Sequence, residues 1–437
     1  MRRTTPQSPA FPRRPDTGAP ARSTDRGRAD RNTLPAEAEA AYTRQHVTLR
    51  MRREARRESR RFRGRFDASQ AGDGFLATAR KRSARAARKP VPAAGPKSIN
   101  LALQGGGSHG AFTWGVLDRL LEDGRVTIDG ICGTSAGAMN AVLVAHGLMH
   151  GGLDGARASL ADFWRRVSEL GAMLNPAAAL AGSPGPGKAG VPPGLAAQQW
   201  VMGAFTRTFS PYQFNPLNLN PLRDLLSACV DFEALHHCDR VKLFLCATNV
   251  RSGKVRIFDN ASMSVDAVMA SACLPHLFQA VEIDGEHYWD GGYMGNPVLY
   301  PLFYETRTRD VVVVMVNQIR REDVPMSPAE IADRVSEISF NSSLMREMRA
   351  VEFVSRQLTE GWLKPEYARR MRHVLVHLIR ADATMGSLAA ATKTSTDLRF
   401  LHQLRDLGRA SASLWLDENH VHVGERSTVD LRSEFLD

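Results

Sequence analysis

The sequence predicts an α/β fold, in which a sheet of short apolar strands is covered by helices. Near residues 98–147, two strand–turn–helix units follow one another, and each has glycines in its turn. Further along, Val311–Val316 is an unbroken apolar run of mostly β-branched residues, which is typical of a strand buried on both faces. Because ligands of such sheets bind at the carboxyl ends of the strands, the two turns are the first candidates for a site.

Residues 1–97 differ in composition from the rest of the chain. They contain 25 Lys and Arg against nine Asp and Glu, whereas the whole chain of 437 residues has a net charge of +11, so the remainder carries −5. Residues 1–35 are rich in Pro, Arg and Ser, which predicts disorder. Residues 36–66 fit either a basic helix that contacts an anionic membrane or a solvated, partly helical tail. The segment lacks a nucleic-acid-binding motif, and we expect no specific nucleic-acid partner.

Periodicity and punctuation by Gly and Pro predict the elements of the remaining chain. Short apolar runs indicate strands at 98–104, 127–132, 242–248, 254–258, 311–317 and 373–380, and a hairpin at 281–289. Helical patterns occur at 111–122, 138–147, 153–170, 221–229, 264–273, 327–360 and 396–417. The Ala-, Gly- and Pro-rich stretch 171–200 has apolar flanks and fits either a lid over an apolar site or ordinary surface packing.

The chain has five cysteines, an odd number, and no C-x-x-C pair. This usage predicts neither a disulfide framework nor a zinc ribbon and indicates a reducing compartment. Cys132 and Cys246 lie in apolar strand-like runs, so we expect them to be buried structural thiols. The sequence shows no secretory signal and no apolar run near the ~20 residues that span a bilayer. We therefore expect a cytoplasmic protein with at most peripheral contact at the inner face of a membrane.

A G-x-S-x-G motif, Gly133-Thr134-Ser135-Ala136-Gly137, lies between a predicted strand and an apolar helix. This arrangement is typical of a nucleophile elbow, a strained turn that displays a serine hydroxyl. The small neighbours of Ser135 permit the sharp turn, and the helix that begins behind it places N–H groups beside the serine. We interpret Ser135 as a nucleophile.

A glycine-rich loop joins the first predicted strand to the first predicted helix: Gly105-Gly106-Gly107-Ser108-His109-Gly110. Read as G-x-G-x-x-G, it fits a dinucleotide-binding loop, with Asp129 at about the expected separation. Alternatively, its backbone N–H groups form an oxyanion hole for a tetrahedral intermediate. We favour the oxyanion hole, because acyl transfer needs a displayed serine at the next strand end and dinucleotide binding does not.

A serine nucleophile needs a base, which is most often a histidine held by a carboxylate. Eleven histidines follow Ser135, and none is distinguished by its context. Asp290 is distinguished among the carboxylates, because it follows an aromatic strand end and precedes Gly291 and Gly292. The two glycines would hold the carboxylate at a tight turn and let another backbone approach, although an isolated Asp-Gly-Gly is more often a local turn.

These motifs, at 105–110, 133–137 and 290–292, resemble in order and approximate spacing those of the patatin-like phospholipase family. Between them, Ser271–Phe278 is similar to that family's segment of small residues, Pro and Phe. The resemblance covers about 99–303, with weaker similarity to bacterial members towards the C-terminus. It implies a three-layer α/β/α fold with a central, mostly parallel sheet.

The resemblance also implies a domain organisation and a chemistry. A catalytic domain at 99–303 would follow the basic segment 1–97, and the strands and helices of 304–437 would complete it or pack on it. The family hydrolyses lipid acyl esters with a Ser–Asp dyad, so Ser135 corresponds to the nucleophile and Asp290 to the general base. The glycine-rich loop corresponds to the oxyanion hole. The expected partner is a lipid acyl-ester substrate, and no metal or organic cofactor is implied.

One position departs from the family pattern. The family often has Arg or Lys before the last glycine of the loop, where this chain has His109. An unperturbed His is mostly neutral at pH 7, so a fixed positive charge is lost while the backbone donors remain. Two alternatives stay open: an α/β-hydrolase-type esterase with a Ser–His–Asp triad, and a membrane-recruited regulatory protein without catalytic activity.

Overall fold

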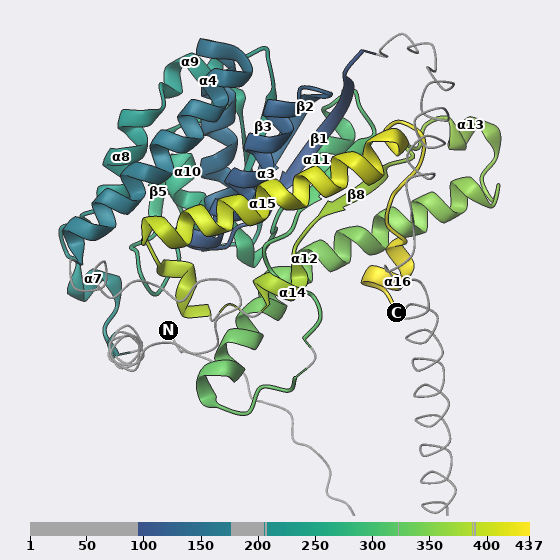
Figure 1. Cartoon of the computed structure of the whole chain (residues 1–437). Helices are drawn as coiled ribbons and strands as arrows, with labels where there is room; N and C mark the ends of the chain where they lie inside the picture. Colours follow the sequence, from purple (N-terminus) through teal and green to yellow (C-terminus); the bar gives the residue numbers. More distant parts are fainter. Residues whose placement is uncertain (1–94, 176–204, 206–207, 322, 387, 389) are drawn as a thin grey trace, which may run out of the picture. The chain divides into compact units, whose positions relative to one another are not determined.

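The computed structural model of the chain describes residues 95–175, 205, 208–321, 323–386, 388 and 390–437 (Figure 1). The disorder predicted for 1–35, the basic helix predicted for 36–66 and most of the lid predicted for 171–200 lie outside these residues. Over the described ranges, no helix combines the length with the apolar character that a membrane crossing requires.

The apolar runs form strands β1 (Lys97–Leu103), β2 (Val126–Gly133), β3 (Lys242–Asn249), β4 (Val255–Asp259), β5 (Val281–Ile283), β6 (Glu286–Asp290), β7 (Asp310–Val314) and β8 (Leu375–Ile379). In the described part of the chain they make one eight-stranded sheet in the order β5-β6-β3-β2-β1-β7-β8, with β4 paired to β3. The pairs β1–β2, β1–β7, β2–β3 and β7–β8 are parallel. The pairs β3–β4, β3–β6 and β5–β6 are antiparallel. The sheet is therefore mostly parallel, as predicted.

The longer helices are α3 (Gly110–Asp123), α4 (Ala136–Leu174), α8 (Pro221–Cys229), α10 (Val265–Ser271), α12 (Pro328–Thr359) and α15 (Leu398–Asn419). The shorter α-helices are α7 (Pro211–Phe214), α9 (Phe232–His236), α11 (Tyr300–Tyr304), α13 (Pro365–Ala368), α14 (Asp382–Met385) and α16 (Leu431–Phe435). Single turns of 3-10 helix are η1 (Gly107–His109), η2 (Asn260–Ser262), η3 (Gly291–Tyr293), η4 (Ala390–Thr394) and η5 (His420–His422).

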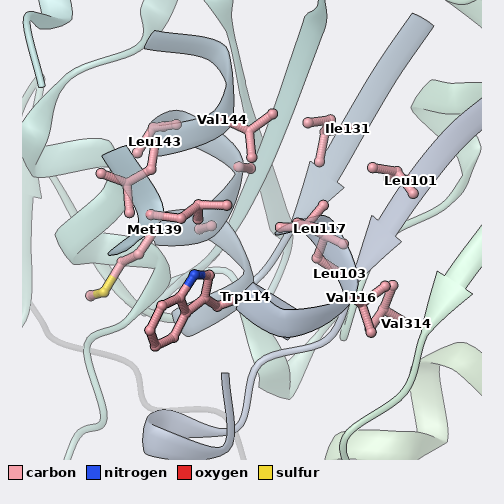
Figure 2. Packing of buried hydrophobic residues seen from close by; sticks show 14 of the residues in the cluster. Leu101, Leu103, Trp114, Val116, Leu117, Ile131, Met139, Leu143, Val144 and Val314 are labelled. Atoms are coloured by element: carbon pink, nitrogen blue, oxygen red, sulfur yellow. The ribbon is translucent and has the colours of Figure 1, made fainter. Parts of the chain in front are cut away.

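Helices cover both faces of the sheet. On one face, α3, α4, α10 and α15 bury apolar side chains against β1, β2 and β3, and Figure 2 shows part of this core. On the other face, α11, α12 and α16 pack against β7 and β8 through a second apolar cluster. Alternate residues of β1 divide between the faces, with Leu101 and Leu103 in the first cluster and Ala102 in the second. The three-layer α/β/α fold is confirmed.

Some predicted elements have different bounds. The helices predicted at 138–147 and 153–170 belong to one element, α4, with non-helical backbone at Gly151 and Gly152. The strand predicted at 311–317 ends at Val314, because the residues that follow turn towards the glycine-rich loop. The short helices α7, α9 and α11 are not predicted, since a single turn or two shows no helical periodicity.

Cys132 and Cys246 are buried, as the sequence predicts. All five cysteines are free, and Cys273 is also buried. Burial raises the pKa of Cys246 to about 12, so its thiol stays protonated at neutral pH.

α3 and α15 pack backbone to backbone, because a glycine in each helix faces the other helix. A Cβ atom on Gly115 would lie 1.8 Å from the carbonyl oxygen of Arg405, and one on Gly408 would lie 2.0 Å from that of Phe112. Any side chain at either glycine must therefore push the two helices apart. In Figure 1, α15 runs across α3, the helix that begins at the glycine-rich loop.

We predict that Gly115→Ala and Gly408→Ala each lower the free energy of unfolding by about 1–3 kcal/mol, as overpacking of a close contact does. Ala has the higher intrinsic helix propensity, so a loss reports the contact and not the helix. Chemical denaturation followed by circular dichroism measures the change. Gly151→Ala is the control, because a Cβ atom there meets nothing within 4 Å. An equal loss in the control would contradict this explanation.

Candidate active site

The turn after β2 has the backbone of a nucleophile elbow. Ser135 has φ 56° and ψ −122°, a conformation that residues with a side chain rarely adopt. Two glycines make room for the turn. A Cβ atom on Gly133 would lie 2.6 Å from the carbonyl oxygen of Gly137, and one on Gly137 would lie 2.3 Å from that of Leu103. The backbone strain is therefore held at Ser135, immediately before α4.

Buried polar contacts hold the elbow in this conformation. The N–H of Ser135 donates to the hydroxyl of Ser271 at 3.0 Å, and the hydroxyl of Thr134 donates to the carbonyl of Gly295 at 2.8 Å. Thr134 and Ser271 are fully buried, whereas Ser135 is partly exposed. A buried scaffold thus presents the hydroxyl of Ser135 at an accessible position.

The amides of the glycine-rich loop fall into two groups. Three of them have acceptors: Gly105 donates to Oδ1 of Asn296 at 2.6 Å, while His109 and Gly110 donate to carbonyls within the loop. The other three donate to no acceptor among the described residues: Gly106, Gly107 and Ser108. These amides are the ones left to bind a negatively charged ligand atom.

Side chains from distant parts of the chain fix the start of this loop. Oε1 of Gln104 accepts hydrogen bonds from the N–H groups of Val316 and Asn317 at 3.0 and 3.1 Å. The side-chain amide of Asn317 donates to the carbonyl of Gly105 at 2.8 Å. Because Asn296 accepts from the N–H of the same glycine, side chains hold Gly105 on both sides. The loop therefore has a fixed geometry at its first residue.

Asp290 lies at the same height in the sheet as Ser135, although β6 runs antiparallel to β3 and β2 runs parallel to it. Gly133, the last residue of β2, pairs with Leu245 of β3, so Ser135 follows level with Ala247. Asp290, the last residue of the antiparallel strand β6, pairs with Ala247 itself. The register of β3 with its two neighbours thus brings the elbow and the carboxylate to the same height in the sheet.

Both glycines after Asp290 are required by close neighbours. A Cβ atom on Gly291 would lie 2.1 Å from the carbonyl oxygen of Cys246, and one on Gly292 would lie 2.2 Å from a ring carbon of Phe340 on α12. The first contact is the close approach of another backbone that the Asp-Gly-Gly sequence suggests. The turn that follows Asp290 is therefore held between β3 and α12.

The carboxylate of Asp290 is fully buried, and only one of its two oxygens accepts a hydrogen bond from the described residues. Oδ1 accepts the N–H of Gly292 at 2.7 Å, while Oδ2 has no hydrogen-bond partner among the described residues. Burial raises the pKa of Asp290 to about 7, and the Gly292 N–H and the nearby Ser135 hydroxyl oppose that rise. A buried carboxylate oxygen beside a serine, with a pKa near neutrality, suits a proton acceptor.

His109 is buried and neutral. Its Nε2 lies 2.8 Å from the hydroxyl of Thr392. Burial and, to a lesser extent, the positive charge of Lys393 lower the pKa of His109 to about 3. The loop therefore carries no charge at this position at neutral pH.

No described histidine makes a hydrogen bond to Ser135 or Asp290. A buried His–Asp pair lies elsewhere: Nε2 of His377 is 3.1 Å from Oδ1 of Asp310, and its Nδ1 is 2.9 Å from the hydroxyl of Thr428. Asp310 is the first residue of β7, so the pair lies near the amino ends of the parallel strands, away from Ser135. This geometry does not support the triad alternative.

Asp129, the acidic residue of the dinucleotide interpretation, has a different role. Its Oδ2 accepts hydrogen bonds from the N–H groups of Arg307 and Thr308 at 2.5 and 3.0 Å. Asp129 lies in β2 where its pairing register with β1 shifts, between the partners of Ile99 and Asn100. These two residues belong to the amino-terminal half of β1. The acid is thus turned away from the glycine-rich loop.

The described residues also contain no group of three or more His, Cys, Asp or Glu that could hold a metal ion.

Sequence reasoning missed the residues that position the site. Ser271 lies in a segment singled out for its resemblance, but nothing in the sequence shows that its hydroxyl holds Ser135. Asn317 ends a predicted strand and Lys393 belongs to no pattern, and neither lies in one of the three motifs. They can be recognised only in the folded structure, where β7 places residues 315–318 beside the glycine-rich loop.

Comparison with known proteins gives one family. Residues 101–302 match the family model described as patatin-like phospholipase. No curated protein matches the chain. Among solved structures, VipD from Legionella pneumophila is similar over 78% of this chain and 73% of its own, with 14% identity and a TM-score of 0.36. A chain of the complex of full-length SpcU with full-length ExoU, from the type III secretion system of Pseudomonas aeruginosa, is similar over 78% and 77%, with 14% identity and a TM-score of 0.24.

Neither structural likeness is strong enough to add to the family match. The match itself spans β1 to α11 and includes the elbow, the glycine-rich loop and the Asp-Gly-Gly turn. It agrees with the mostly parallel sheet and the helices on both of its faces. Residues 101–302 therefore form a patatin-like phospholipase domain, and the chain is a lipid hydrolase.

Proposed function

We propose that the chain hydrolyses acyl esters of phospholipids or related lipids through an acyl-enzyme, with Ser135 as the nucleophile and Asp290 as the general base. One observation carries this proposal. A strained and partly exposed serine lies beside a fully buried carboxylate whose Oδ2 has no hydrogen-bond partner among the described residues. The Gly133–Gly137 elbow follows β2 and the Gly291–Gly292 turn follows β6, the two strands that flank β3.

In the first half-reaction, Oγ of Ser135 attacks the ester carbonyl and its proton passes to Oδ2 of Asp290. The carbonyl oxygen becomes an oxyanion, which the free amides of Gly106, Gly107 and Ser108 would stabilise. The intermediate collapses, the C–O bond to the alcohol breaks, and the leaving alkoxide takes the proton back from Asp290. The products are a free alcohol and an ester between the acyl chain and Ser135.

In the second half-reaction, a water molecule attacks the acyl carbonyl and gives a proton to Asp290. The second tetrahedral intermediate uses the same amides and expels Oγ of Ser135, which recovers the proton. A fatty acid leaves, and the enzyme returns to its starting state. An aspartate is a weak base, so the oxyanion donors and the raised pKa of Asp290 must together lower the barrier.

We predict that Ser135→Ala and Asp290→Asn each lower the rate of fatty-acid release by at least about 10³-fold, as removal of a nucleophile or its base does. Both replacements keep the size of the side chain close to the original, so the fold should persist. The assay measures product release from phospholipid vesicles and from a short-chain ester. A fluorophosphonate should label the wild type at Ser135, as mapped by mass spectrometry.

Asp310→Asn is the matched control, because Asp310 is also a buried acid but pairs with His377 away from the elbow. Its activity should stay near that of the wild type at temperatures where it is folded. If Asp290→Asn stayed active and a histidine variant were dead, the enzyme would use a triad. If wild type and Ser135→Ala were equally inactive on every lipid tested, the non-catalytic alternative would hold.

The pH dependence follows from the raised pKa of Asp290. A general base works only when ionised, so kcat/KM should rise about tenfold per pH unit below pH 7 and level off above it. An ordinary aspartate would reach this plateau near pH 4. A pH–rate profile on a soluble short-chain ester measures the acidic limb. A midpoint near pH 4 would contradict a buried base.

We also infer that the basic segment 1–97 contacts anionic membrane from the cytoplasmic side. Deletion of residues 1–94 should weaken binding to vesicles that contain phosphatidylserine, and added salt should weaken wild-type binding in the same way. The deletion stops at 94 because Lys97 begins β1 and its ammonium donates to the carbonyls of Val421 and Val423 at 2.8 Å. Unchanged binding in a flotation assay would reject this contact.

A further inference from the structure

The single turn η4 packs against the glycine-rich loop, although it lies far beyond the segment that matches the family. Gly107 has φ 58°, and a Cβ atom on it would lie 2.3 Å from the carbonyl oxygen of Lys393 and 3.6 Å from its Cβ. On the other side of the loop's turn, His109 contacts the hydroxyl of Thr392 at 2.8 Å. Two neighbouring residues of η4 thus form one wall of the loop.

The side chain of Lys393 contacts the loop by a second route. Its ammonium donates to Oδ1 of Asn317 at 2.8 Å. The side-chain amide of Asn317 in turn donates to the carbonyl of Gly105 at 2.8 Å. A cation that binds the amide oxygen strengthens the N–H donors of the same amide, because hydrogen bonds in a chain polarise one another. Lys393 therefore reaches the loop in two ways. Its backbone packs against Gly107, and its ammonium acts on Gly105 through the side chain of Asn317.

The charges around Lys393 come from several elements. His109 of the loop is neutral, so it offers no positive charge to an oxyanion. Asp333 and Glu337 of α12 favour the charged form of Lys393, whereas burial and Arg321 oppose it, and the net effect lowers the pKa of Lys393. Arg321 and Arg334 bind the carboxylate of Glu337 at 2.6 and 3.2 Å, which leaves that acid partly neutralised.

We propose that Lys393 is the positioning residue of the oxyanion loop, fixing Gly105 through Asn317 and giving the loop the positive charge that His109 lacks. This inference rests on the proposed function. Gly105 directly precedes the three amides that would bind the oxyanion, so any movement of its peptide displaces them. An ammonium behind the loop also favours negative charge at the oxyanion.

The test compares Lys393→Met with Lys393→Arg on a short-chain ester, with Lys254→Met as the control because Lys254 is exposed on the turn before β4. Lys393→Met keeps an unbranched side chain that is one atom shorter and removes the charge. We expect its kcat to fall about 10- to 100-fold with little change in KM, as for a lost oxyanion contact. Lys393→Arg should keep most of the activity.

Two further readouts separate positioning from packing. Wild-type activity should fall at alkaline pH when Lys393 loses its proton, and Lys393→Arg should move that fall to higher pH, because guanidinium stays protonated. Asn317→Ala should lose about as much kcat as Lys393→Met, and the double variant should lose little more, since both act through one contact. Circular dichroism and thermal unfolding check that each variant is folded.

Retention of kcat within twofold by folded Lys393→Met would overturn the proposal. So would equal losses in Lys393→Met and Lys393→Arg with an unmoved alkaline limb, which would indicate packing alone. Ser135→Ala is assayed in parallel. If it is inactive, failure of the Lys393 prediction counts against Lys393 only. If it retains activity, the proposed dyad is wrong and the role of Lys393 falls with it.

Discussion

The close approach of the ends of β1 and β2 is the constraint on which the site depends. A Cβ atom on Gly105 would lie 2.8 Å from both the Cβ of Ser135 and the carbonyl oxygen of Thr134, and one on Gly137 would meet the carbonyl of Leu103. Two strand ends with ordinary side chains would have to separate. The glycines therefore allow the loop amides and the strained serine to lie close together. A side chain at Gly105 or Gly137 would separate the two strand ends and widen the site, even though neither residue takes part in the reaction.

The position of Asp290 follows from a reversal in the sheet. The strands β1, β2, β3, β7 and β8 run parallel, and their carboxyl ends form one edge. An acid at the end of another parallel strand would lie at that edge, close to water. Because β6 runs antiparallel to β3, its last residue points back into the sheet, and Asp290 is buried at the level of Ala247. Strand direction and packing thus provide the low-dielectric surroundings that raise the pKa of Asp290.

The sequence predicted the parts of this protein that local rules govern. Strand β2, the elbow and α4 follow from an apolar run, a G-x-S-x-G turn and a helix that begins immediately behind it. The glycines of the Asp-Gly-Gly turn also follow from their sequence, because a backbone that approaches closely excludes side chains. The geometry around Ser135 and Asp290 agrees with the roles we propose for them, which remain to be tested by substitution.

What the sequence could not predict depends on contacts between remote segments. Lys393 and Asn317 are ordinary polar residues until β7 and η4 are placed beside the loop. The role of Ser271 depends on which way the end of α10 faces. Asp129 fitted a motif by separation alone, and the irregularity between β1 and β2 turned it towards Arg307 and Thr308 instead. Spacing along the chain carries no information about which way the side chains of Ser271 and Asp129 point.

Burial of Asp290 also affects the folding equilibrium. In the unfolded chain this acid titrates near 3.8, whereas in the folded protein its pKa is about 7, so the folded state binds the proton more tightly between these values. The contribution of this group to stability therefore falls as the pH rises through this interval and becomes constant above it, at a cost of about 4 kcal/mol. Glu347, whose pKa burial also raises to about 7, acts in the same direction. For these two acids, the pH range in which Asp290 is ready to act as a base is thus the range in which their burial costs the fold most. Burial of His109 acts in the opposite direction, because it lowers the pKa of that group.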